Sequence, residues 1–333
     1  MINSILNPQI NNEEDIEEII ELEQNLRPKW MKDIIGRKKE KASLSVMISA
    51  AKQRGEAIDH ILLHGPPGLG KTTFAQVIAQ EIGAEFFSTS GPALERKGDL
   101  VSILSNLPDK GIFFIDEVHR LNKAIEELLY SAMEDRKIDI VIGKGPSART
   151  LKLDLNSFTV IGATTRVGML SSPFRDRFGV DLYLDFYSYE ELQELIMQKA
   201  QILNVKIKAE AAMEIAKRSR RTPRIAIRIL KRVRDLAEVN GKSLIDIEAA
   251  KAGMKMISVD EYGLDDLDRK ILITMATSFK GGPVGLSTLA AALSEDIDTI
   301  REVYEPFLIS EGFLTRSPKG RIVTEKTIKY LKL

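Results

Sequence analysis

Short apolar runs alternate with amphipathic stretches between about residue 26 and residue 184. Runs of this length that are rich in β-branched and aromatic residues predict buried strands. Strands separated by helical stretches predict a mostly parallel sheet covered on both faces, which is an α/β fold. The runs are HILLH at 60–64, EFFS at 85–88, IFFID at 112–116, FTVIGA at 158–163 and VDLYL at 180–184.

The strand pattern stops after Leu184. Residues 188–252 have the periodicity of consecutive helices, and Ser188 with the acidic residues behind it predicts a capped helix start. We expect a small helical domain with its own core.

A third pattern begins near Val259. Helical runs at 265–278, 286–293 and 296–310 precede a hairpin that turns at residues 317–320. Three helices followed by a basic β-ribbon predict a winged-helix module. The expected organisation is an acidic extension over 1–25, a large α/β domain over 26–186, a helical domain over 187–257 and a winged-helix head over 258–333.

Composition narrows the chemistry of this 333-residue chain. It has no cysteine, which excludes disulfides, a thiolate nucleophile and Cys-ligated zinc. His60, His64 and His119 are too scattered to predict a metal cluster. No apolar stretch approaches the ~18 residues that a membrane span needs. The first 25 residues carry seven acids and no base, the opposite of a secretory n-region, so we expect a cytoplasmic protein.

Charge is segregated along the chain. The 48 basic residues balance 48 acidic ones, yet residues 217–234 hold nine bases and no acid. We interpret most of that stretch as a solvated helix face. From residue 313 to the end there are six bases and one acid, so the head is basic where a nucleic acid would lie.

The strongest motif is GPPGLGKT at 65–72, which fits the phosphate loop G-x-x-x-x-G-K-[ST]. Gly68 and Gly70 let the backbone curl so that its N–H groups face phosphate oxygens, with a helix N-terminus behind them. Lys71 would neutralise the β- and γ-phosphates of ATP, and the Thr72 hydroxyl would ligate Mg²⁺. The alternative is a Gly/Pro turn beside a surface lysine.

A carboxylate must lie close to such a magnesium ion. Asp116 and Glu117 end an apolar strand, and Asp116 would hold the metal directly or through water. Glu117 would act as general base on the attacking water. The alternative is that these acids cap the next helix.

Two further segments complete the predicted hydrolytic site. Thr165, at the end of the strand FTVIGA, could contact the γ-phosphate or the water, unless the Thr pair merely ends the strand. The arginines of SPFRDRFG at 172–179 are candidates for an arginine finger supplied by a neighbouring subunit. The alternative for this motif is a surface ion pair.

In chain order these parts resemble an AAA+ ATPase and, more closely, the RuvB family of bacterial Holliday-junction branch-migration motors. The last three of the matching segments are the most specific. The segments are LRPKWMKDIIG at 26–36, GPPGLGKTT at 65–73, FIDEVHRL at 114–121, GATTRVGMLSSPFRDRFG at 162–179, RTPRIAIRIL at 221–230 and EPFLISEGFLTRSPKGR at 305–321.

The resemblance implies further nucleotide contacts. Leu26 and Arg27 would border the adenine, Thr73 would follow the phosphate loop, and Tyr187 would lie near the nucleotide at the domain junction. Arg224 would reach the nucleotide from the helical lid, a position that suits its place behind Pro223 in a first helical turn.

The resemblance also implies that some arginines contact other molecules, namely a neighbouring subunit and DNA. Arg177 would be the finger that acts on the neighbouring subunit. Arg316 and Arg321 in the wing would contact DNA.

The resemblance also implies partners and an assembly. A homo-hexameric ring would surround duplex DNA and act on four-way junctions with a RuvA-like junction-binding protein and a RuvC-like resolvase. The stretch 137–155 alternates like a hairpin that turns at 143–146, with Leu151, Leu153 and Leu155 on one face. Either it packs on its own domain, or the apolar run 140–142 near its turn docks the RuvA-like partner.

Two other functions stay open. One is a related AAA+ clamp loader or replication initiator, in which neither the RDRFG context nor the wing motif is expected. The other is a winged-helix transcription regulator that uses ATP as a switch. Glu117 and Arg177 disfavour it, because a switch needs neither a catalytic base nor an arginine finger.

Overall fold

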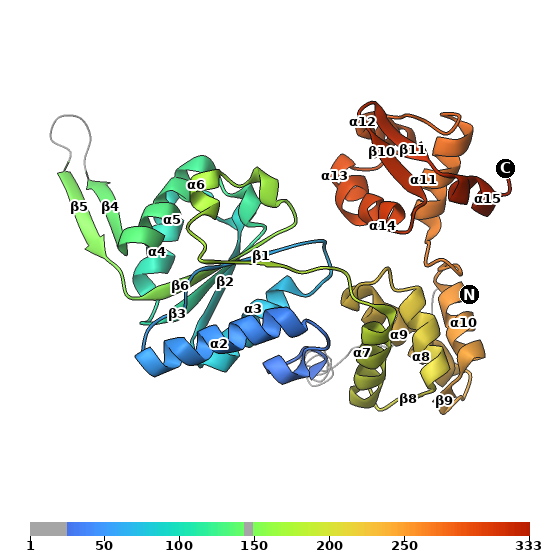
Figure 1. The fold of residues 1–333 in the computed structure, drawn as a ribbon, viewed down its shortest axis with the longest axis horizontal. Coiled ribbons are helices and arrows are strands. Elements are labelled where there is room, and N and C mark those ends of the chain that lie inside the picture. Colours follow the sequence, from blue (N-terminus) through green and yellow to red (C-terminus); the bar gives the residue numbers. More distant parts are fainter. Residues whose placement is uncertain (1–24, 143–148) are drawn as a thin grey trace, which may run out of the picture.

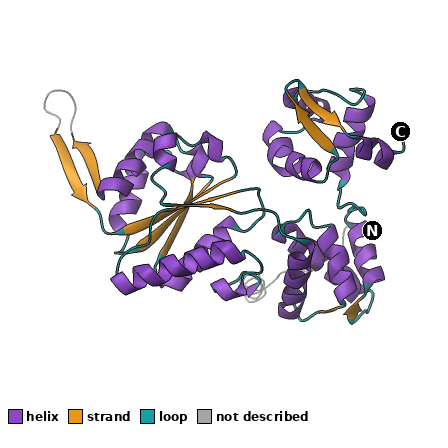
Figure 2. Ribbon diagram, in the orientation of Figure 1, coloured by secondary structure: helices purple, strands orange, loops and turns teal. Residues whose placement is uncertain are grey.

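The structure is a computed structural model that describes residues 25–142 and 149–333. In chain order the chain forms a sheet domain, a helical lid and a winged-helix head (Figure 1). Figure 2 shows helices on both sides of the central sheet and a lid and head made mostly of helices. The predicted acidic extension falls on residues outside this description, apart from Asn25. Within the described ranges, no helix combines the length and the apolarity that crossing a bilayer requires.

Five parallel strands form the central sheet, in the order β2–β3–β6–β1–β7, which confirms the predicted α/β fold. The register pairs His64 with Thr164 and Ile115 with Gly162. The carboxyl ends of β1, β3 and β6 therefore meet at one edge of the sheet. All five predicted runs are strands: β1 (Ile61–His64), β2 (Phe86–Ser90), β3 (Gly111–Asp116), β6 (Phe158–Thr164) and β7 (Val180–Tyr183).

Alternate side chains of each strand enter different apolar clusters, one on each face. Ile112 and Phe114 pack with α2 and α3, whereas Phe113 and Ile115 pack with α4, α5 and α6. Burying one such aromatic side chain contributes roughly 1.5–3 kcal/mol. The covering helices are α2 (Lys38–Arg54), α3 (Lys71–Ile82), α4 (Lys97–Asn106), α5 (Lys123–Asp135) and α6 (Ser172–Arg175).

A hairpin of β4 (Lys137–Ile142) and β5 (Arg149–Asp154) projects from the sheet domain, as predicted (Figure 1). At its base Leu153 and Leu155 pack partly buried on the domain's own core, whereas Leu151 is 52% exposed. The base of the hairpin therefore packs on its own domain, which is the first of the two predicted alternatives. The predicted turn at 143–146 and the side chains of the apolar run 140–142 lie outside what is described, so docking through this tip stays a prediction.

The lid begins where the sequence predicts a capped helix. The Ser188 hydroxyl accepts the Glu191 N–H at 3.1 Å, and the Glu191 carboxylate accepts the Ser188 N–H at 2.8 Å. The helices are α7 (Tyr189–Ile202), α8 (Ala209–Lys217), α9 (Pro223–Val239) and α10 (Ile247–Met256). Two strands of two residues each, β8 (Lys206–Ile207) and β9 (Leu244–Ile245), were not predicted, because they are too short to produce an alternating pattern.

The head is a winged helix whose third helical run is divided. Pro306 has no N–H to donate to the carbonyl of Glu302, and the chain widens there into the π-helical turn η6 (Ile300–Tyr304). The other elements are α11 (Asp266–Thr277), α12 (Leu286–Leu293), α13 (Ile297–Thr299), α14 (Glu305–Ser310), the wing strands β10 (Leu314–Ser317) and β11 (Gly320–Val323), and the unpredicted α15 (Glu325–Leu331).

Candidate functional site

The phosphate loop lies between β1 and α3, with its backbone in conformations that favour glycine. Gly68 and Gly70 have φ of 79° and 84°, in the left-handed region. A Cβ on Gly65 would come within 2.2 Å of the Leu184 carbonyl oxygen, so a side chain is excluded there. The loop leads directly into α3, whose first N–H groups and dipole favour an anion. This arrangement is the predicted cradle rather than an ordinary turn.

Lys71 turns into the cradle instead of toward solvent. Its ammonium donates to the carbonyl oxygens of Gly65 at 2.8 Å and Pro66 at 2.9 Å, and the residue is 8% exposed. Burial lowers the pKa of Lys71 to about 8, with the Asp116 carboxylate opposing the shift. The alternative of a surface lysine is therefore wrong.

The predicted magnesium ligands lie together. The Thr72 hydroxyl donates to Oδ2 of Asp116 at 3.2 Å, across the gap between α3 and the end of β3. Hydroxyl and carboxylate oxygens are the donors that Mg²⁺ prefers, and the ion usually takes its other ligands from phosphate oxygens and water. The residues present therefore fit the ion.

Glu117 follows Asp116 at the end of β3 in a left-handed conformation, with φ of 49°. The side chain is 46% exposed, and its carboxylate accepts from Arg120 at 3.1 Å. Neither acid caps the next helix, because the side chain of Asn122 accepts the N–H of Ile125 at the start of α5. The helix-capping interpretation of the two acids is wrong.

The two threonines at the end of β6 have different partners. Thr164 is buried, accepts the Arg166 N–H at 2.9 Å and lies 2.9 Å from Nδ1 of His119. Thr165 donates to Oε2 of Glu302 in the head, at 3.2 Å. Thr165 thus lies at the sheet edge with its partner in the head, whereas Thr164 and His119 join the ends of β3 and β6.

The side chains expected around the adenine gather at the junction of sheet domain and lid. Leu26 and Tyr187 are buried and belong to one apolar cluster with Leu69 of the phosphate loop. Arg27 is exposed, and Thr73 is half-buried in the first turn of α3. The Arg37 guanidinium lies 4.5 Å from the centre of the Tyr187 ring, a contact that no motif indicated.

Arg224 stands beside the phosphate loop of its own chain. Pro223 occupies the first turn of α9, as predicted, and the Arg224 N–H donates to the Gly68 carbonyl at 3.4 Å. The start of α9 is thereby fixed against the loop. The structure brings Arg224 to the same site as Lys71 and Thr72.

Arg177 is held elsewhere. It donates to the Tyr130 hydroxyl at 2.5 Å and pairs with Glu134 at 3.0 Å, both on α5, and its side chain is 36% exposed. No residue of the phosphate loop is among its partners in the described chain. Arg175 of the same motif is exposed.

The two wing arginines share one acid. Each guanidinium makes a bidentate pair with Glu305, at 2.9 Å for both contacts of Arg316 and at 2.7 and 3.1 Å for Arg321. Glu305 is 1% exposed, whereas the side chains are 57% exposed for Arg316 and 20% for Arg321. Glu305 is the first residue of the matching segment 305–321, although no role was predicted for it, and it holds both arginines on one side of the wing.

Arg220, one of the basic residues predicted to form a solvated helix face, joins the lid to the head. Arg220 is 5% exposed and pairs with Asp265 and Asp268 at the start of α11. Its guanidinium also faces the rings of Tyr304 and Phe307, at 5.2 and 5.4 Å. For Arg220 the solvated interpretation is therefore wrong.

Two cavities adjoin the phosphate loop. One, of about 540 Å³, is bounded by Gly65 to Pro67, the loop that carries Thr165 and Arg166, and the head residues Glu302 and Arg316. The other, of about 260 Å³, lies between the phosphate loop, the start of α9 and the head. The phosphate site therefore faces the head as well as the lid.

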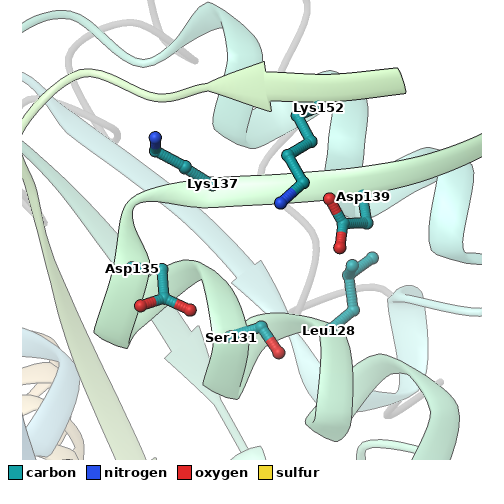
Figure 3. Close-up of a pocket in the computed structure, with 6 residues that line it drawn as sticks. All are labelled: Leu128, Ser131, Asp135, Lys137, Asp139 and Lys152. Atoms are coloured by element: carbon teal, nitrogen blue, oxygen red, sulfur yellow. The ribbon is translucent and has the colours of Figure 1, made fainter. Parts of the chain in front are cut away.

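A third cavity, of about 420 Å³, lies at the base of the projecting hairpin (Figure 3). Figure 3 shows side chains from α5 and from both hairpin strands around it, with Lys152 directed toward Asp139. None of the predicted site residues lines it. The lining residues are Leu128, Ser131, Asp135, Lys137, Asp139 and Lys152.

Comparison with known proteins places each part of the chain in one family. Residues 26–184 match the Holliday junction DNA helicase RuvB P-loop domain, 187–260 the RuvB AAA lid domain, and 261–332 the RuvB C-terminal winged helix domain.

Whole-chain relatives agree. The Holliday junction branch migration complex subunit RuvB of Koribacter versatilis is 54% identical over 318 residues, which are 96% of this chain and 88% of that protein. Its counterpart in Clostridium kluyveri is 54% identical over 310 residues, 93% of this chain and 89% of that one.

Solved structures are similar over the same length. The Thermotoga maritima RuvB Holliday junction branch migration motor has a TM-score of 0.86 and 51% identity, covering 92% of this chain and 98% of that one. A lysine-to-arginine mutant of that protein has a TM-score of 0.87 at 51% identity, covering 93% and 99%. The chain belongs to the RuvB family.

Proposed function

We propose that this chain is an ATP-driven DNA motor that promotes branch migration of Holliday junctions. The observation that carries the proposal is the meeting of the phosphate loop, Asp116 and Thr165 at one sheet edge, in a chain whose other end is a basic winged helix. Relatives that match nearly the whole chain are named as branch migration complex subunits, which supports the same function.

Each residue of the site has a task in hydrolysis. The loop amides and Lys71 would bind the phosphates, and Leu26, Arg27, Thr73 and Tyr187 would border the rest of the nucleotide. Thr72 and Asp116 would hold Mg²⁺, which neutralises phosphate charge when bound.

Glu117 would take the proton of the attacking water, which Thr165 helps to orient. For this step Glu117 must leave Arg120, and an exposed ion pair of this kind costs little to break. Arg224 would report the state of the γ-phosphate to the lid through the fixed start of α9.

The site needs a second subunit if Arg177 is its arginine finger. The partners of Arg177 in the described chain are on α5 and not on its own phosphate loop, which supports a role for it at the nucleotide of a neighbour. A homo-hexameric ring around duplex DNA would place one site at each interface, and hydrolysis would then be coupled to movement between subunits.

The head would grip the DNA backbone through Arg316 and Arg321. Phosphate contacts are largely independent of sequence, which suits a protein that moves along DNA. The projecting hairpin would dock a RuvA-like junction-binding partner, and a RuvC-like resolvase would act in the same complex. Such a motor works in the cytoplasm, where chromosomal DNA is recombined and repaired.

The test is ATP-dependent movement of a synthetic four-way junction, with and without a junction-binding partner, against a linear duplex control. Wild-type protein should move the junction, and Glu117→Gln should bind ATP but neither hydrolyse it nor move the junction. ATP turnover stimulated by linear duplex without any junction movement would contradict the proposal and favour a clamp loader or initiator.

A further inference from the structure

The head touches the sheet domain at the loop that carries the predicted γ-phosphate sensor. Glu302, in the π-helical turn η6, accepts the Thr165 hydroxyl at 3.2 Å. The same carboxylate pairs with Arg166, which also pairs with Asp298 at 2.7 Å. Residues about 130 positions apart in the sequence are thereby joined by one hydroxyl and one guanidinium.

This contact is partly shielded from water. The side chains of Arg166 and Glu302 are 20% and 22% exposed, whereas Asp298 at the rim is 58% exposed. The Glu302 side chain also lines both cavities that adjoin the phosphate loop, together with Pro66 and Pro67. A negative group of the head therefore lies beside the loop that is predicted to bind phosphate.

The head segment is held from its other side by the lid. Tyr304, two residues after Glu302, lies under the guanidinium of Arg220, which is in turn paired with Asp265 and Asp268. Arg220 is only four residues before Arg224, whose backbone N–H is hydrogen-bonded to the phosphate loop. The lid segment that holds the head near Glu302 is therefore also attached to the nucleotide site.

We propose that docking of Glu302 on Thr165 and Arg166 is an inhibitory contact within the chain, and that ATP binding and head docking exclude one another. The Thr165 hydroxyl has one proton to donate, and Glu302 takes the position that a γ-phosphate oxygen would occupy. Two anions at this site also repel each other. Because the wing residue Arg316 lines the same cavity, head release would also separate it from the phosphate loop.

Exclusion of this kind is reciprocal, so weakening the head contact must strengthen ATP binding, by at most the factor by which the contact is weakened. The expected variant is Glu302→Gln, which removes the charge but keeps the size of the side chain. The matched control is Glu325→Gln, an exposed acid of the same head at the start of α15. ADP serves as the ligand without a γ-phosphate.

The first measurement is the affinity of fluorescent ATP and ADP analogues for the full chain. Glu302→Gln should bind the ATP analogue about five-fold or more tightly than wild type and change ADP binding much less, with Glu325→Gln unchanged. Equal affinities of wild type and Glu302→Gln for the ATP analogue would overturn the inference.

The second measurement needs no nucleotide and follows head position directly. The chain has no native cysteine, so Val46→Cys on α2 and Ile273→Cys on α11, 71% and 46% exposed, take a pair of distance labels. In wild type the distribution of distances between the two labels should be narrow and should shift when a non-hydrolysable ATP analogue is added. In Glu302→Gln this distribution should already be broad without nucleotide.

A lid-to-head pair is the internal control. Val239→Cys with Ile273→Cys should keep its distance in every state, because Arg220 still joins lid and head. If the Val46–Ile273 distance of the nucleotide-free chain is the same in wild type and Glu302→Gln, the inference fails.

The inference rests on the proposed placement of the γ-phosphate at Thr165, and the two failures differ. Loss of that placement would appear as Thr165→Val, added to Glu302→Gln, binding the ATP analogue as Glu302→Gln alone does, since the head contact is already removed in both. Loss of the inference alone would appear as an unchanged head distance in Glu302→Gln.

Discussion

Two arginines expected at the phosphates occupy opposite kinds of position. Arg224 is fixed against the phosphate loop of its own chain by a backbone hydrogen bond to Gly68. Arg177 is held by Tyr130 and Glu134 on α5, and its side chain is 36% exposed. On the proposed roles of these two arginines, the difference means that one chain supplies the residues that bind the nucleotide, whereas the arginine finger would act on the nucleotide of a neighbouring subunit.

The largest effect should separate these two arginines. Arg177→Ala should lower ATP turnover by about 10³-fold and leave nucleotide affinity nearly unchanged, because a finger acts on transition-state charge. Arg224→Ala should instead weaken ATP-analogue binding, because its position is beside the phosphates. Steady-state turnover and fluorescent-nucleotide affinity measure the two effects.

Arg175→Ala is the matched control, since Arg175 is exposed in the same motif. It should behave as wild type. A loss of turnover in Arg175→Ala equal to that of Arg177→Ala would mean that the motif acts through its overall charge and not through one positioned guanidinium.

The next effect concerns the ion pairs of Arg220 with the head, which connect the lid segment that contains Arg224 to the head. Arg220→Ala leaves Asp265 and the fully buried Asp268 without their cation, which should cost about 3–5 kcal/mol. Arg232→Ala, which removes an exposed pair with Asp235, should cost less than about 1 kcal/mol. Denaturant unfolding of the full chain compares them, and equal midpoints would show that the buried joint does not stabilise the lid and head.

A smaller effect concerns the pH dependence of ATP binding, which tests the phosphate loop and Lys71. The Lys71 pKa of about 8 means that the free site loses its ammonium as pH rises above 8. Phosphate binding favours the protonated form, so ATP affinity should be level below about pH 7 and fall by up to about tenfold per pH unit above 8. Fluorescent-nucleotide titrations from pH 6 to 10 measure this.

The control for this profile is Lys71→Arg, whose guanidinium stays charged across the range. Its profile should be flat whatever its absolute affinity. A wild-type profile as flat as that of Lys71→Arg would contradict the buried, shifted lysine.

The smallest effect extends the contrast between outward and inward arginines to the wing. If each wing arginine contacts a phosphate, Arg316→Ala and Arg321→Ala should each reduce the salt slope of duplex binding by about 1 and leave basal ATP turnover largely unchanged. Arg321→Ala should also destabilise the head more, because its side chain is only 20% exposed beside Glu305. Unchanged salt slopes would remove these residues from the DNA interface.

The sheet and the phosphate loop could both be predicted from the sequence, because each leaves a clear pattern in it. Strands buried on both faces appear as continuous apolar runs, and the conformations of Gly68 and Gly70 leave few alternatives to glycine. The carboxyl ends of neighbouring parallel strands share one edge of the sheet, so the sequence alone predicts that Asp116 and Thr165 lie beside Lys71.

The contacts between domains could not be predicted in this way. Arg220 and Glu302 look like surface charges in the sequence, yet their partners lie 45 or more residues away. No periodicity links such positions. The π-helical turn that presents Glu302 depends on Pro306 inside an otherwise helical run, and the sequence pattern gave one helix there.

The central claim, that the site is shared between subunits, is tested most directly by mixing two inactive variants. Arg177→Ala retains Lys71, and Lys71→Ala retains Arg177, so an interface that joins them in one orientation has every part. At equal amounts about a quarter of the interfaces in a randomly mixed ring should be complete, and ATP turnover should reappear in proportion. Turnover that stays absent at every mixing ratio, although the mixed subunits assemble, would contradict the shared site.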